Sequence, residues 1–553
     1  MTFVITQGCC RDASCVSVCP VQCIRPRPGD PEFETAEQLY IDPAVCIDCG
    51  ACVEECPVDA IHPDHGLPAE LSDYLDVNAS YFSPISDYDR IPVHHRRPRP
   101  PEDAEELRVA VIGTGPAACY AITELATNRG TRVTVLDRQP APFGLVRSGV
   151  APDHPHTKLI GDRFASVLAR PNVHCFFAVH VDTDITVEEL LEYHHAVIVA
   201  TGAQDDRRLG IDGEDLPGSH GAKDFVAWYN GHPDHSADSV DLSGERAVII
   251  GNGNVALDIG RVLSRDPSAL SRTDIADHAL EALRRSNIRE VVIVGRRGPE
   301  SIACSAGELE ELSQLPGVDL TVTCPQEEFA HFESSLSTTT DDSRRRRAQV
   351  ILNAAASGAR RRIDLRFLSV PLALNGTTSV ESITLAGQRI DRSGGEPLLV
   401  DTGTTRTLEA SLVVRAIGFA SQPLAGLPFD PAKAILPNRS GRVLEPETGE
   451  TLAGVYCAGW IKRGPTGVIG SNKVCAEETV AALIDDFAAG RLGKPVRTHE
   501  DFAALMNERV PEVVDVAGWQ RIDAAERERG AAAGRPRVKF VTMEDMLSVA
   551  NGR

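Results

Sequence analysis

Nine of the fifteen cysteines lie in the first 66 residues, in two runs whose spacing suits iron–sulfur chemistry. The later run reads C-x2-C-x2-C-x3-C-P, and the earlier run reads C-x2-D-x2-C-x3-C-P, with an aspartate where a thiol is expected. In proteins with two such runs, three cysteines of one run hold one cluster, and the fourth, followed by proline, ligates the other cluster. The spacing therefore predicts two clusters in a small N-terminal domain, residues 1–66.

The same rule divides the ligands between two sites. One site has four thiolates and is predicted to hold a [4Fe–4S] cluster. The other has three thiolates and Asp12. Because a carboxylate binds iron less firmly than a thiolate does, this Asp12 site is predicted to hold either a [3Fe–4S] cluster or a [4Fe–4S] cluster with Asp12 as fourth ligand. The four-cysteine site comprises Cys19, Cys46, Cys49 and Cys52, and the Asp12 site comprises Cys9, Asp12, Cys15 and Cys56.

Two other interpretations of the cysteines fit less well. Zinc ribbons have two C-x2-C pairs separated by a longer insert. A disulfide framework needs an oxidising compartment, whereas the N-terminus lacks the basic and apolar regions of a signal peptide. A cytoplasmic location is therefore expected. Cys10 and Cys23 fit neither ligand pattern and are expected to be small buried thiols.

A first nucleotide site is predicted where the run LRVAVI, which reads as a strand, ends in Gly113-x-Gly115-x-x-Ala118 and a helix opens. The glycines allow a tight turn and let a pyrophosphate approach the helix N-terminus. The next apolar strand ends at Asp137, where a carboxylate can bind ribose hydroxyls and would repel a 2′-phosphate. The site is therefore predicted to bind an unphosphorylated adenosine, as in FAD or NAD.

A second nucleotide site is predicted at Gly251-x-Gly253-x-x-Ala256. Here the following strand ends in Arg296 and Arg297 rather than in an acid. Guanidinium groups at this point match a 2′-phosphate, so the site is expected to prefer NADPH. A flavin between NADPH and the clusters would split the two electrons of a hydride into single electrons.

Length and charge narrow the class of protein. A chain of 553 residues is too long for one core. It has no apolar run of the length needed to span a membrane, and its net charge of −23 argues against nucleic acid as a partner. Residues 1–66 carry eleven acidic side chains and three arginines, a net charge of 3 − 11 = −8.

The N-terminal segment resembles the bacterial seven-iron and eight-iron ferredoxins, including a Cys-Pro-Val at Cys19 and at Cys56. From residue 107 onward the chain resembles the adrenodoxin-reductase-type ferredoxin–NADP reductases, and most closely their mycobacterial members. This resemblance is carried by GLVRSGVAPDHP (144–155), GNGNVALD (251–258), VVIVGRRGP (291–299) and AGWIKRGPTGVIGSNK (458–473). The whole chain thus resembles a fusion of a ferredoxin with such a reductase.

The resemblance implies an α/β reductase of two Rossmann-like domains, with the NADP domain inserted in the FAD domain, behind a small α+β ferredoxin-like domain. It also implies that His154 and Glu311 lie near the nicotinamide as positioning or proton-handling groups. The implied FAD contacts are Ala117, Asp137, Leu145, Val181, Trp460, Gly467, Val468 and Ile469, and the implied NADPH contacts are Asn252, Gly253, Asn254, Val255, Arg296, Arg297 and Glu308.

The expected domain order places a linker without helical periodicity at 67–106, the FAD-binding domain at 107–207 and 412–553, and the NADP-binding domain at 208–411. The apolar runs 196–202 and 412–418 are both expected in the flavin domain, Gly467 is expected to open a helix, and the tail 491–553 carries no assigned chemistry. Basic clusters at 94–99, 344–347 and 360–362 are expected to be solvated loops, the alternative being that one of them docks the acidic ferredoxin.

The predicted function is NADPH:ferredoxin oxidoreductase with a built-in ferredoxin, passing electrons from NADPH through FAD and the clusters to an external acceptor such as a cytochrome P450 or a free ferredoxin. Three alternatives remain: reverse flow that reduces NADP+, a glutamate-synthase-like small subunit, and an iron–sulfur redox sensor that binds a partner.

Overall fold

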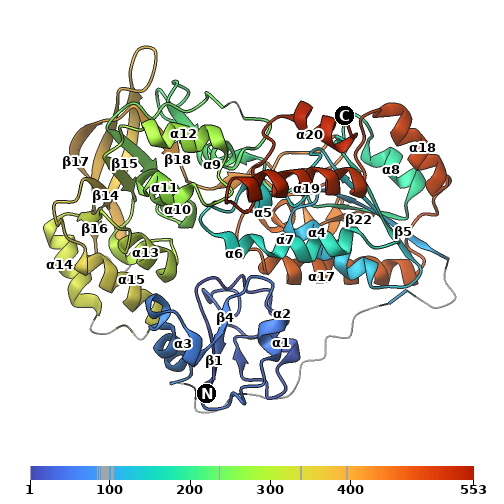
Figure 1. Cartoon of the computed structure of the whole chain (residues 1–553), viewed down its shortest axis with the longest axis horizontal. Helices are drawn as coiled ribbons and strands as arrows, with labels where there is room; N and C mark the ends of the chain where they lie inside the picture. Colours follow the sequence, from blue (N-terminus) through green and yellow to red (C-terminus); the bar gives the residue numbers. More distant parts are fainter. Residues whose placement is uncertain are drawn as a thin grey trace.

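Two largely parallel sheets organise most of the chain, and the N-terminal domain lies against both of the units that they form (Figure 1). The computed structural model describes residues 2–83, 85, 88, 99–100, 105–235, 237–336, 339, 341–393 and 397–553. Among these residues, no helix is both long enough and apolar enough to cross a membrane. The predicted α/β class with a small N-terminal domain is confirmed.

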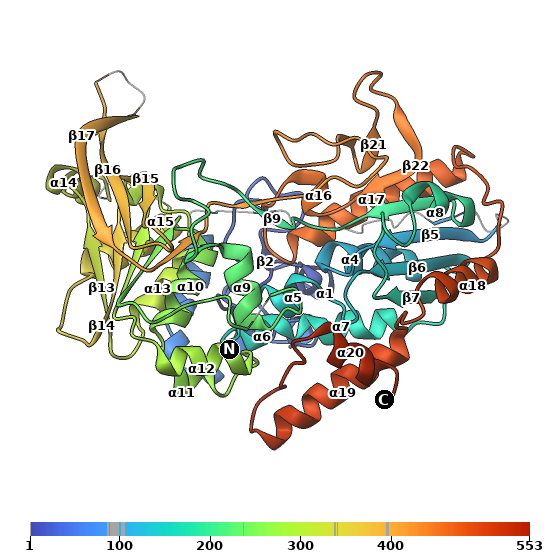
Figure 2. The same ribbon diagram turned by 90° about the horizontal axis from the view of Figure 1, so that it is seen from above.

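The first nucleotide unit is built on a seven-stranded sheet of order β20-β21-β22-β8-β5-β6-β7. Its central strands are parallel and buried on both faces, which explains their continuous β-branched sequences. Helices cover both faces (Figure 2). The strands are β5 (Leu107–Ile112), β6 (Thr131–Asp137), β7 (Val173–Phe177), β8 (Ala196–Val199), β20 (Asn438–Arg439), β21 (Arg442–Leu444) and β22 (Thr451–Cys457), and the helices are α4 (Pro116–Ala126), α5 (Leu145–Ser148), α6 (Pro155–Lys158), α7 (Ile160–Leu168), α8 (Val187–Tyr193), α16 (Trp460–Arg463), α17 (Ser471–Ala488) and α18 (His499–Arg509).

The second nucleotide unit contains a parallel six-stranded sheet of order β10-β18-β11-β12-β14-β13 and a three-stranded antiparallel sheet at the end away from the first unit (Figure 2). The strands of the two sheets are β10 (Ser219–Gly221), β11 (Arg246–Ile250), β12 (Glu290–Val294), β13 (Val318–Thr323), β14 (Arg361–Arg366), β18 (Leu412–Arg415), β15 (Ser369–Asn375), β16 (Ser382–Asp391) and β17 (Leu398–Glu409). The helices are α9 (Ala222–Asn230), α10 (Asn254–Ser264), α11 (Pro267–Leu270), α12 (Asp277–Arg285), α13 (Ala306–Ser313), α14 (Gln326–Ser335) and α15 (Asp342–Asn353).

The placement of strand β18 corrects one prediction. Its sequence was expected in the flavin domain, but Val413 pairs with Val248 of β11, and the strand also pairs with β10. An apolar run buried on both faces reads the same in either parallel sheet, so the pattern alone does not assign it. The chain returns to the first unit just beyond, where β19 (Phe419–Ala420) pairs with β9 (Asp205–Asp206).

The N-terminal domain joins two small ladders, β1 (Phe3–Ile5) with β4 (Ile61–Pro63) and β2 (Ile24–Arg25) with β3 (Tyr40–Ile41), and two short helices, α1 (Ser14–Val18) and α2 (Ala51–Glu55). It extends beyond residue 66, because helix α3 (Tyr74–Phe82) packs on it. The Asn78 side chain accepts hydrogen bonds from the backbone N–H groups of Ile5 and Ile41. The prediction of a linker without helical periodicity from residue 67 is therefore wrong at α3, a helix of nine residues that is too short to show a periodicity.

The tail adds helices α19 (Val516–Ala532) and α20 (Met543–Ala550), which pack together on one side of the molecule (Figure 2). Of the predicted basic clusters, residues 94–98 lie outside the described part of the chain. Arg361 and Arg362 open β14, where Arg361 donates to the carbonyls of Ser264 and Arg265, and Arg362 pairs with Glu290 at 2.5 Å. These two residues therefore lie in a strand rather than in a loop, whereas Arg360 precedes the strand with an exposed side chain.

Candidate functional site

The first glycine turn has the shape that a bound pyrophosphate needs. Gly113 has φ of +102°, and a Cβ there would lie 2.6 Å from the carbonyl oxygen of Ala200. A Cβ on Gly115 would meet nothing within 4 Å, so the backbone before α4 faces open space. The free N–H groups at the start of this eleven-residue helix can therefore reach a phosphate.

Asp137 lies where the sequence predicts a ribose contact, at the end of β6 beside this turn. Its Oδ2 accepts hydrogen bonds from the backbone N–H of Thr114, at 2.9 Å, and from the Thr114 hydroxyl, and its Oδ1 accepts one from Gln139 N–H at 2.9 Å. Burial raises the pKa of this carboxyl, although the hydrogen bonds by themselves would lower it. The side chain is thus fixed beside the glycine turn.

We call the C-terminal segment 458–473, which contains the predicted FAD contacts Trp460 and 467–469, the flavin block. It reaches the first unit's glycine turn from across the sheet. A Cβ on Gly459 would lie 2.5 Å from the Ala117 side chain, so the strand end before Trp460 packs directly on α4. The Trp460 ring stacks on Phe419, with centroids 5.6 Å apart, and its Nε1 donates to the Thr466 carbonyl at 3.1 Å. These contacts fix the indole at the edge of the block.

The other residues predicted to contact FAD are less closely grouped. Leu145 and Val468 are both exposed, and Ile469 packs on the core of the first unit. Val181 is buried on the opposite side of the sheet. Helix α17 begins at Ser471, so Gly467, with φ of +81°, belongs to the preceding turn and does not open the helix as predicted.

The second glycine turn repeats this geometry in the second unit. Gly251 has φ of +120°, and a Cβ there would lie 2.1 Å from the carbonyl oxygen of Ala416, while a Cβ on Gly253 would meet open space. The predicted contacts Asn254 and Val255 form the first turn of α10, with the Asn254 Oδ1 accepting from Ser305 N–H at 2.8 Å.

Arg296 and Arg297 follow β12 with exposed side chains, at the same edge of the sheet as the second glycine turn. Asn252 also lies here, since a Cβ on Gly295 would fall 2.6 Å from its Nδ2. Asn252, Gly253 and the two arginines, which were predicted to contact NADPH, therefore lie at one edge of this sheet. The turn is open at Gly253, and the two cations are free to solvent.

His154 and Glu311 come together between the two units. His154 Nε2 lies 3.2 Å from Glu311 Oε2, and Nδ1 lies 4.0 Å from Glu308 Oε1. Burial opposes a charge on the imidazole, but the hydrogen bond to Glu311 and the nearby carboxylates of Asp258 and Glu308 outweigh it and raise the pKa of His154 to about 9. The imidazole is therefore protonated at neutral pH.

The sequence analysis missed Arg261, which organises this cluster from α10. Its guanidinium is fully buried and pairs with Asp153 at 2.9 Å, Asp258 at 2.7 Å and Glu308 at 2.9 Å. Against the effect of burial, Arg261 lowers the pKa of Asp153 to about 2. An arginine on the apolar face of a helix was the signal that could have identified it.

The cluster also matches the spacing of a metal site, because His154, Asp258 and Glu308 place ligand atoms within 4.8 Å of one another. The Arg261 guanidinium pairs with both of these carboxylates, however, and already offsets part of their charge. Burial and the neighbouring Asp258 raise the pKa of Glu308 to about 7, although the positive charges of His154 and Arg261 act to lower it. This arrangement suits proton handling better than it suits a metal ion.

Replacing His154 by glutamine should change how stability depends on pH. The folded pKa of about 9 lies above the ordinary value of 6.5. The stabilisation from protonated His154 is therefore complete below pH 6.5 and is lost as the pH rises through about 9. In urea unfolding, the free-energy difference between wild type and H154Q should shrink by about 3 kcal/mol between about pH 6 and pH 10. The exposed His65, changed to glutamine, is the control, and a pH-independent difference for H154Q would contradict the assignment.

All four predicted ligands of the Asp12 site line one small cavity. Three thiols and a carboxylate around one space are a donor set that suits a cluster of three or four irons. The Asp12 carboxylate accepts two hydrogen bonds from Ser14, from its N–H at 3.1 Å and its hydroxyl at 2.5 Å.

The four-cysteine site lies closer to the surface of the domain. Cys49 is exposed, Cys46 is half-buried, and Cys19 and Cys52 are buried. Cys23, predicted to be a buried thiol without a ligand role, lies with its sulfur 3.5 Å from that of Cys19. A hydrogen bond from Cys23 lowers the pKa of Cys19. This favours the thiolate form that binds iron.

The Asp12 site faces the flavin block directly. Gly470 N–H donates to the Cys10 carbonyl at 2.8 Å, and Lys473 Nζ donates to the Ser14 hydroxyl at 3.0 Å. A Cβ on Gly470 would lie 2.2 Å from the backbone nitrogen of Asp12. Cys10 is buried as predicted, and its partners include the core of the first unit. The loop that carries Asp12 is thus in contact with the turn 467–470.

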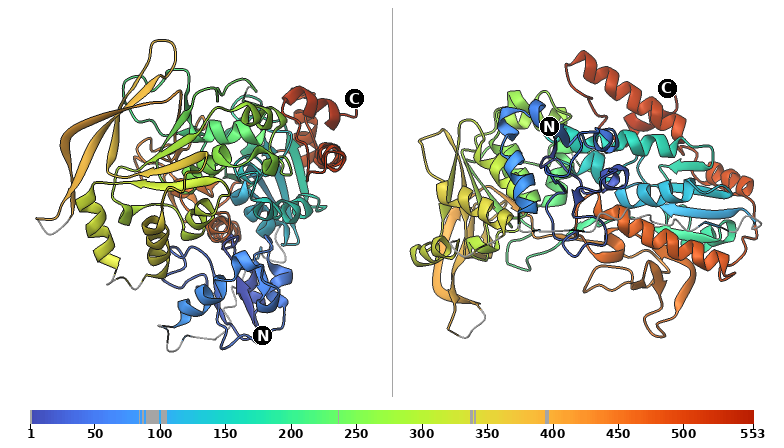
Figure 3. Two further views of the ribbon diagram at one scale, coloured as in Figure 1. Left: turned by 60° about the vertical axis from the view of Figure 1, so that its left-hand side comes forward. Right: turned by 90° about the horizontal axis from the view of Figure 1, so that it is seen from below.

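A second contact joins the N-terminal domain to the second unit (Figure 3). Arg347 of α15 pairs with Glu37, whose other oxygen accepts from Ala306 N–H at 2.9 Å. The Arg346 guanidinium lies 5.2 Å from the centre of the Tyr74 ring. Residues 344–347 therefore lie on a helix, α15, that docks on the N-terminal domain. The expectation of a solvated loop is wrong, and the alternative of a contact with the acidic domain is confirmed.

Two protein-family models match the chain. The model described as pyridine nucleotide-disulphide oxidoreductase matches residues 107–381, and the 4Fe-4S binding domain model matches residues 39–62. The second match contains the complete four-cysteine run, so a 4Fe–4S ferredoxin motif precedes a reductase domain that binds FAD and NADP(H).

Several mycobacterial proteins are similar to this chain over most of its length. A probable ferredoxin/ferredoxin–NADP reductase of Mycobacterium tuberculosis (strain H37Rv) is 46% identical over 566 residues, covering 100% of this chain and 95% of that protein. NADPH-ferredoxin reductase FprA of the same strain is 43% identical over 457 residues, covering 80% of this chain and 99% of FprA. The solved structure of M. tuberculosis FprA in complex with NADPH is 41% identical with a TM-score of 0.75, and covers 81% of this chain and 100% of that chain. Because the 46% identity extends over the whole chain, cysteine runs included, the chain belongs to the ferredoxin/ferredoxin–NADP reductase family and is a ferredoxin–NADP(+) reductase.

Proposed function

We propose that this reductase takes electrons from NADPH and delivers them, by way of FAD and its own two clusters, to an external acceptor protein. The observation that carries the proposal is the contact of the Asp12 loop with the turn 467–470, through Gly470 and Cys10. When bound, FAD accepts a hydride from NADPH and gives up its electrons singly to the clusters. A docked ferredoxin domain keeps that second transfer within the molecule, at a high effective concentration.

The proposed roles of the site residues follow from their positions. Arg296 and Arg297 bind the 2′-phosphate, and the turn at Gly251 and Gly253 holds the pyrophosphate, together with the first turn of α10. At the other nucleotide, the turn at Gly113, Gly115 and Ala118 holds the pyrophosphate of FAD, and Asp137 holds its ribose.

His154 and Glu311 position the reacting end of NADPH, at the junction of the two units. The protonated His154 stays beside the ionised Glu311, whose pKa is lowered by that hydrogen bond against the effect of burial. Arg261, which pairs with Asp153, also lies 3.7 Å from Glu311 and helps to fix the His154–Glu311 pair. Together these groups keep a proton within reach of the junction.

The four-cysteine site is the proposed exit for electrons. The loop that bears it exposes Pro43, Ala44, Ile47 and Cys49, and the Ile47 side chain is 58% exposed. This apolar surface lies on an acidic domain, whose residues 1–66 alone carry a net charge of −8. An acceptor with a basic rim around an apolar centre suits it, because complementary charge guides transient contacts. A cytochrome P450 and a free ferredoxin are the candidate acceptors.

An anaerobic titration of the intact protein with NADPH tests the proposal, followed by flavin absorbance and by electron paramagnetic resonance of the clusters. We expect the flavin to bleach and the cluster signals to change together. The spectrum before reduction also distinguishes a [3Fe–4S] from a [4Fe–4S] cluster at the Asp12 site. The matched control replaces NADPH by NADH at equal concentration.

Two outcomes would favour the alternatives. Bleached flavin with clusters that stay oxidised, combined with NADP+ reduction by chemically reduced protein, would favour flow in the reverse direction. Little reduction of any centre, with a partner protein gained or lost when the clusters are removed, would favour an iron–sulfur sensor.

A further inference from the structure

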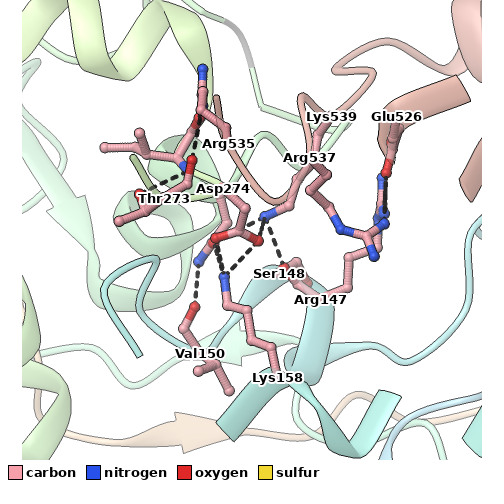
Figure 4. Close-up of polar contacts among 12 residues, drawn as sticks. Arg147, Ser148, Val150, Lys158, Thr273, Asp274, Glu526, Arg535, Arg537 and Lys539 are labelled. Carbon is pink, nitrogen blue, oxygen red and sulfur yellow. Dashed lines mark hydrogen bonds and ion pairs between the residues drawn. The ribbon is translucent and has the colours of Figure 1, made fainter. Parts of the chain in front are cut away.

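The C-terminal tail, to which the sequence assigns no chemistry, lies across the junction of the two nucleotide units (Figure 4). The Lys539 side chain is only 1% exposed. Its Nζ lies 2.9 Å from Asp274 Oδ2 and donates to Asn230 Oδ1 and to the Arg147 carbonyl, each at 3.2 Å. Asp274 and Asn230 belong to the second unit and Arg147 to the first, so one ammonium group contacts both units.

The same carboxylate also holds the first unit directly. Lys158 Nζ lies 2.7 and 2.8 Å from the two oxygens of Asp274, and Asn230 Nδ2 donates to the Val150 carbonyl at 3.1 Å. Lys158 is the last residue of the short helix α6, which begins directly after His154. The contacts therefore fix the segment that carries His154 against the second unit.

A second group of tail contacts supports Lys539. The Glu526 side chain is fully buried and forms a two-pronged ion pair with Arg147, at 2.8 and 2.5 Å. On the opposite side, Arg535 donates to the Thr273 carbonyl at 2.8 Å and pairs with Asp277 at 2.5 Å. The tail is thus bonded to the first unit on one side of Lys539 and to the second unit on the other.

We propose that Lys539 is a positioning residue that sets how the two nucleotide units approach each other, by holding Asp274 and the segment 147–158 in place. The proposal rests on the proposed function, in which His154 lies at the reacting end of NADPH. Two buried lysines share one carboxylate here, so the three side chains hold their places only together. A displacement of about 1 Å at a reacting centre can slow a reaction by about a hundredfold.

The test compares Lys539→Met, which removes the donor and keeps the length of the side chain, with Lys494→Met, a tail lysine that is 80% exposed. The rate of flavin reduction at saturating NADPH, measured per bound flavin, should fall by at least about tenfold in K539M. The Kd for NADP+ should stay within about twofold, because the phosphate-binding arginines keep their places. Hydrogen exchange of segments 144–158 and 222–231 should become faster in K539M. Lys539→Arg, which keeps a cationic donor, should change the rate of flavin reduction and the hydrogen exchange less than K539M does.

Asn230→Ala tests the same contact without removing a member of an ion pair. If K539M fails to bind FAD, Asn230→Ala tests the proposal in its place. We expect the same pattern with smaller changes. Wild-type rates and wild-type exchange in both variants would overturn the proposal. So would a uniform rise in exchange over the whole chain, which would mean a general loss of stability. If NADPH does not reduce the flavin of the wild-type protein, the proposed function fails, whereas the exchange comparison still tests the contact.

Discussion

The double substitution R296A/R297A should lower kcat/KM with NADPH by about 10²–10⁴ and leave kcat/KM with NADH nearly unchanged. Each hydrogen-bonded contact from an arginine to a phosphate contributes about 1.5–3 kcal/mol, and NADH lacks the phosphate that these groups would bind. Both side chains are exposed at the end of β12, so their removal leaves the core of the second unit intact. Steady-state kinetics with the two nucleotides measure the effect.

A matched control is available in the same unit. Arg284 and Arg285 form another adjacent pair, on the surface of α12, where both contact Glu281. Their replacement by alanine should change neither nucleotide's kcat/KM. An equal loss with NADPH and NADH in R296A/R297A would show that the pair acts through folding, and a loss of less than about threefold with NADPH would remove it from the phosphate site.

Changing Gly470 to alanine should uncouple the ferredoxin domain from the flavin. The backbone at Gly470 is helical, with φ of −68°, so alanine is not strained there. Its Cβ would nevertheless lie 2.2 Å from both the Asp12 nitrogen and the Cys10 oxygen, and the loop would have to move away. We expect NADPH to reduce the flavin at close to the wild-type rate, while reduction of the clusters slows by about a hundredfold.

Stopped-flow absorbance of the flavin, combined with rapid-freeze electron paramagnetic resonance of the clusters, separates the two steps. Gly493→Ala is the control, because a Cβ on this exposed glycine meets nothing within 4 Å. Cluster reduction in G470A at the wild-type rate would mean that electrons do not pass through the contact at residues 10–12. Slower reduction of both centres would instead indicate damage to the flavin site.

The sequence by itself determined the chemistry of each centre. The cysteine spacings are local, because ligands two residues apart reach one cluster whatever surrounds them. The glycine turns are local as well, since Gly113 and Gly251 need positive φ, and the strand that follows each turn brings Asp137 or the pair Arg296 and Arg297 to the same edge of a sheet. Fold class and family could therefore be predicted from the sequence, and the nucleotide sites and cluster ligands follow from the same local rules as predictions.

Only the tertiary structure decided how these centres are joined. The hydrogen bond of Lys473 to Ser14 spans 459 positions and that of Lys539 to Arg147 spans 392, so no local pattern announces either one. Strand β18 has the same apolar pattern that either parallel sheet requires, and only its pairing with β11 assigns it. The sequence marks Arg261 and the arginines of α15 as unusual, but their partners Asp153 and Glu37 come from distant segments and only the folded chain identifies them. Local rules fix the conformation and ligand chemistry of a short segment, whereas the partner of a charged side chain depends on which distant elements the folded chain brings beside it.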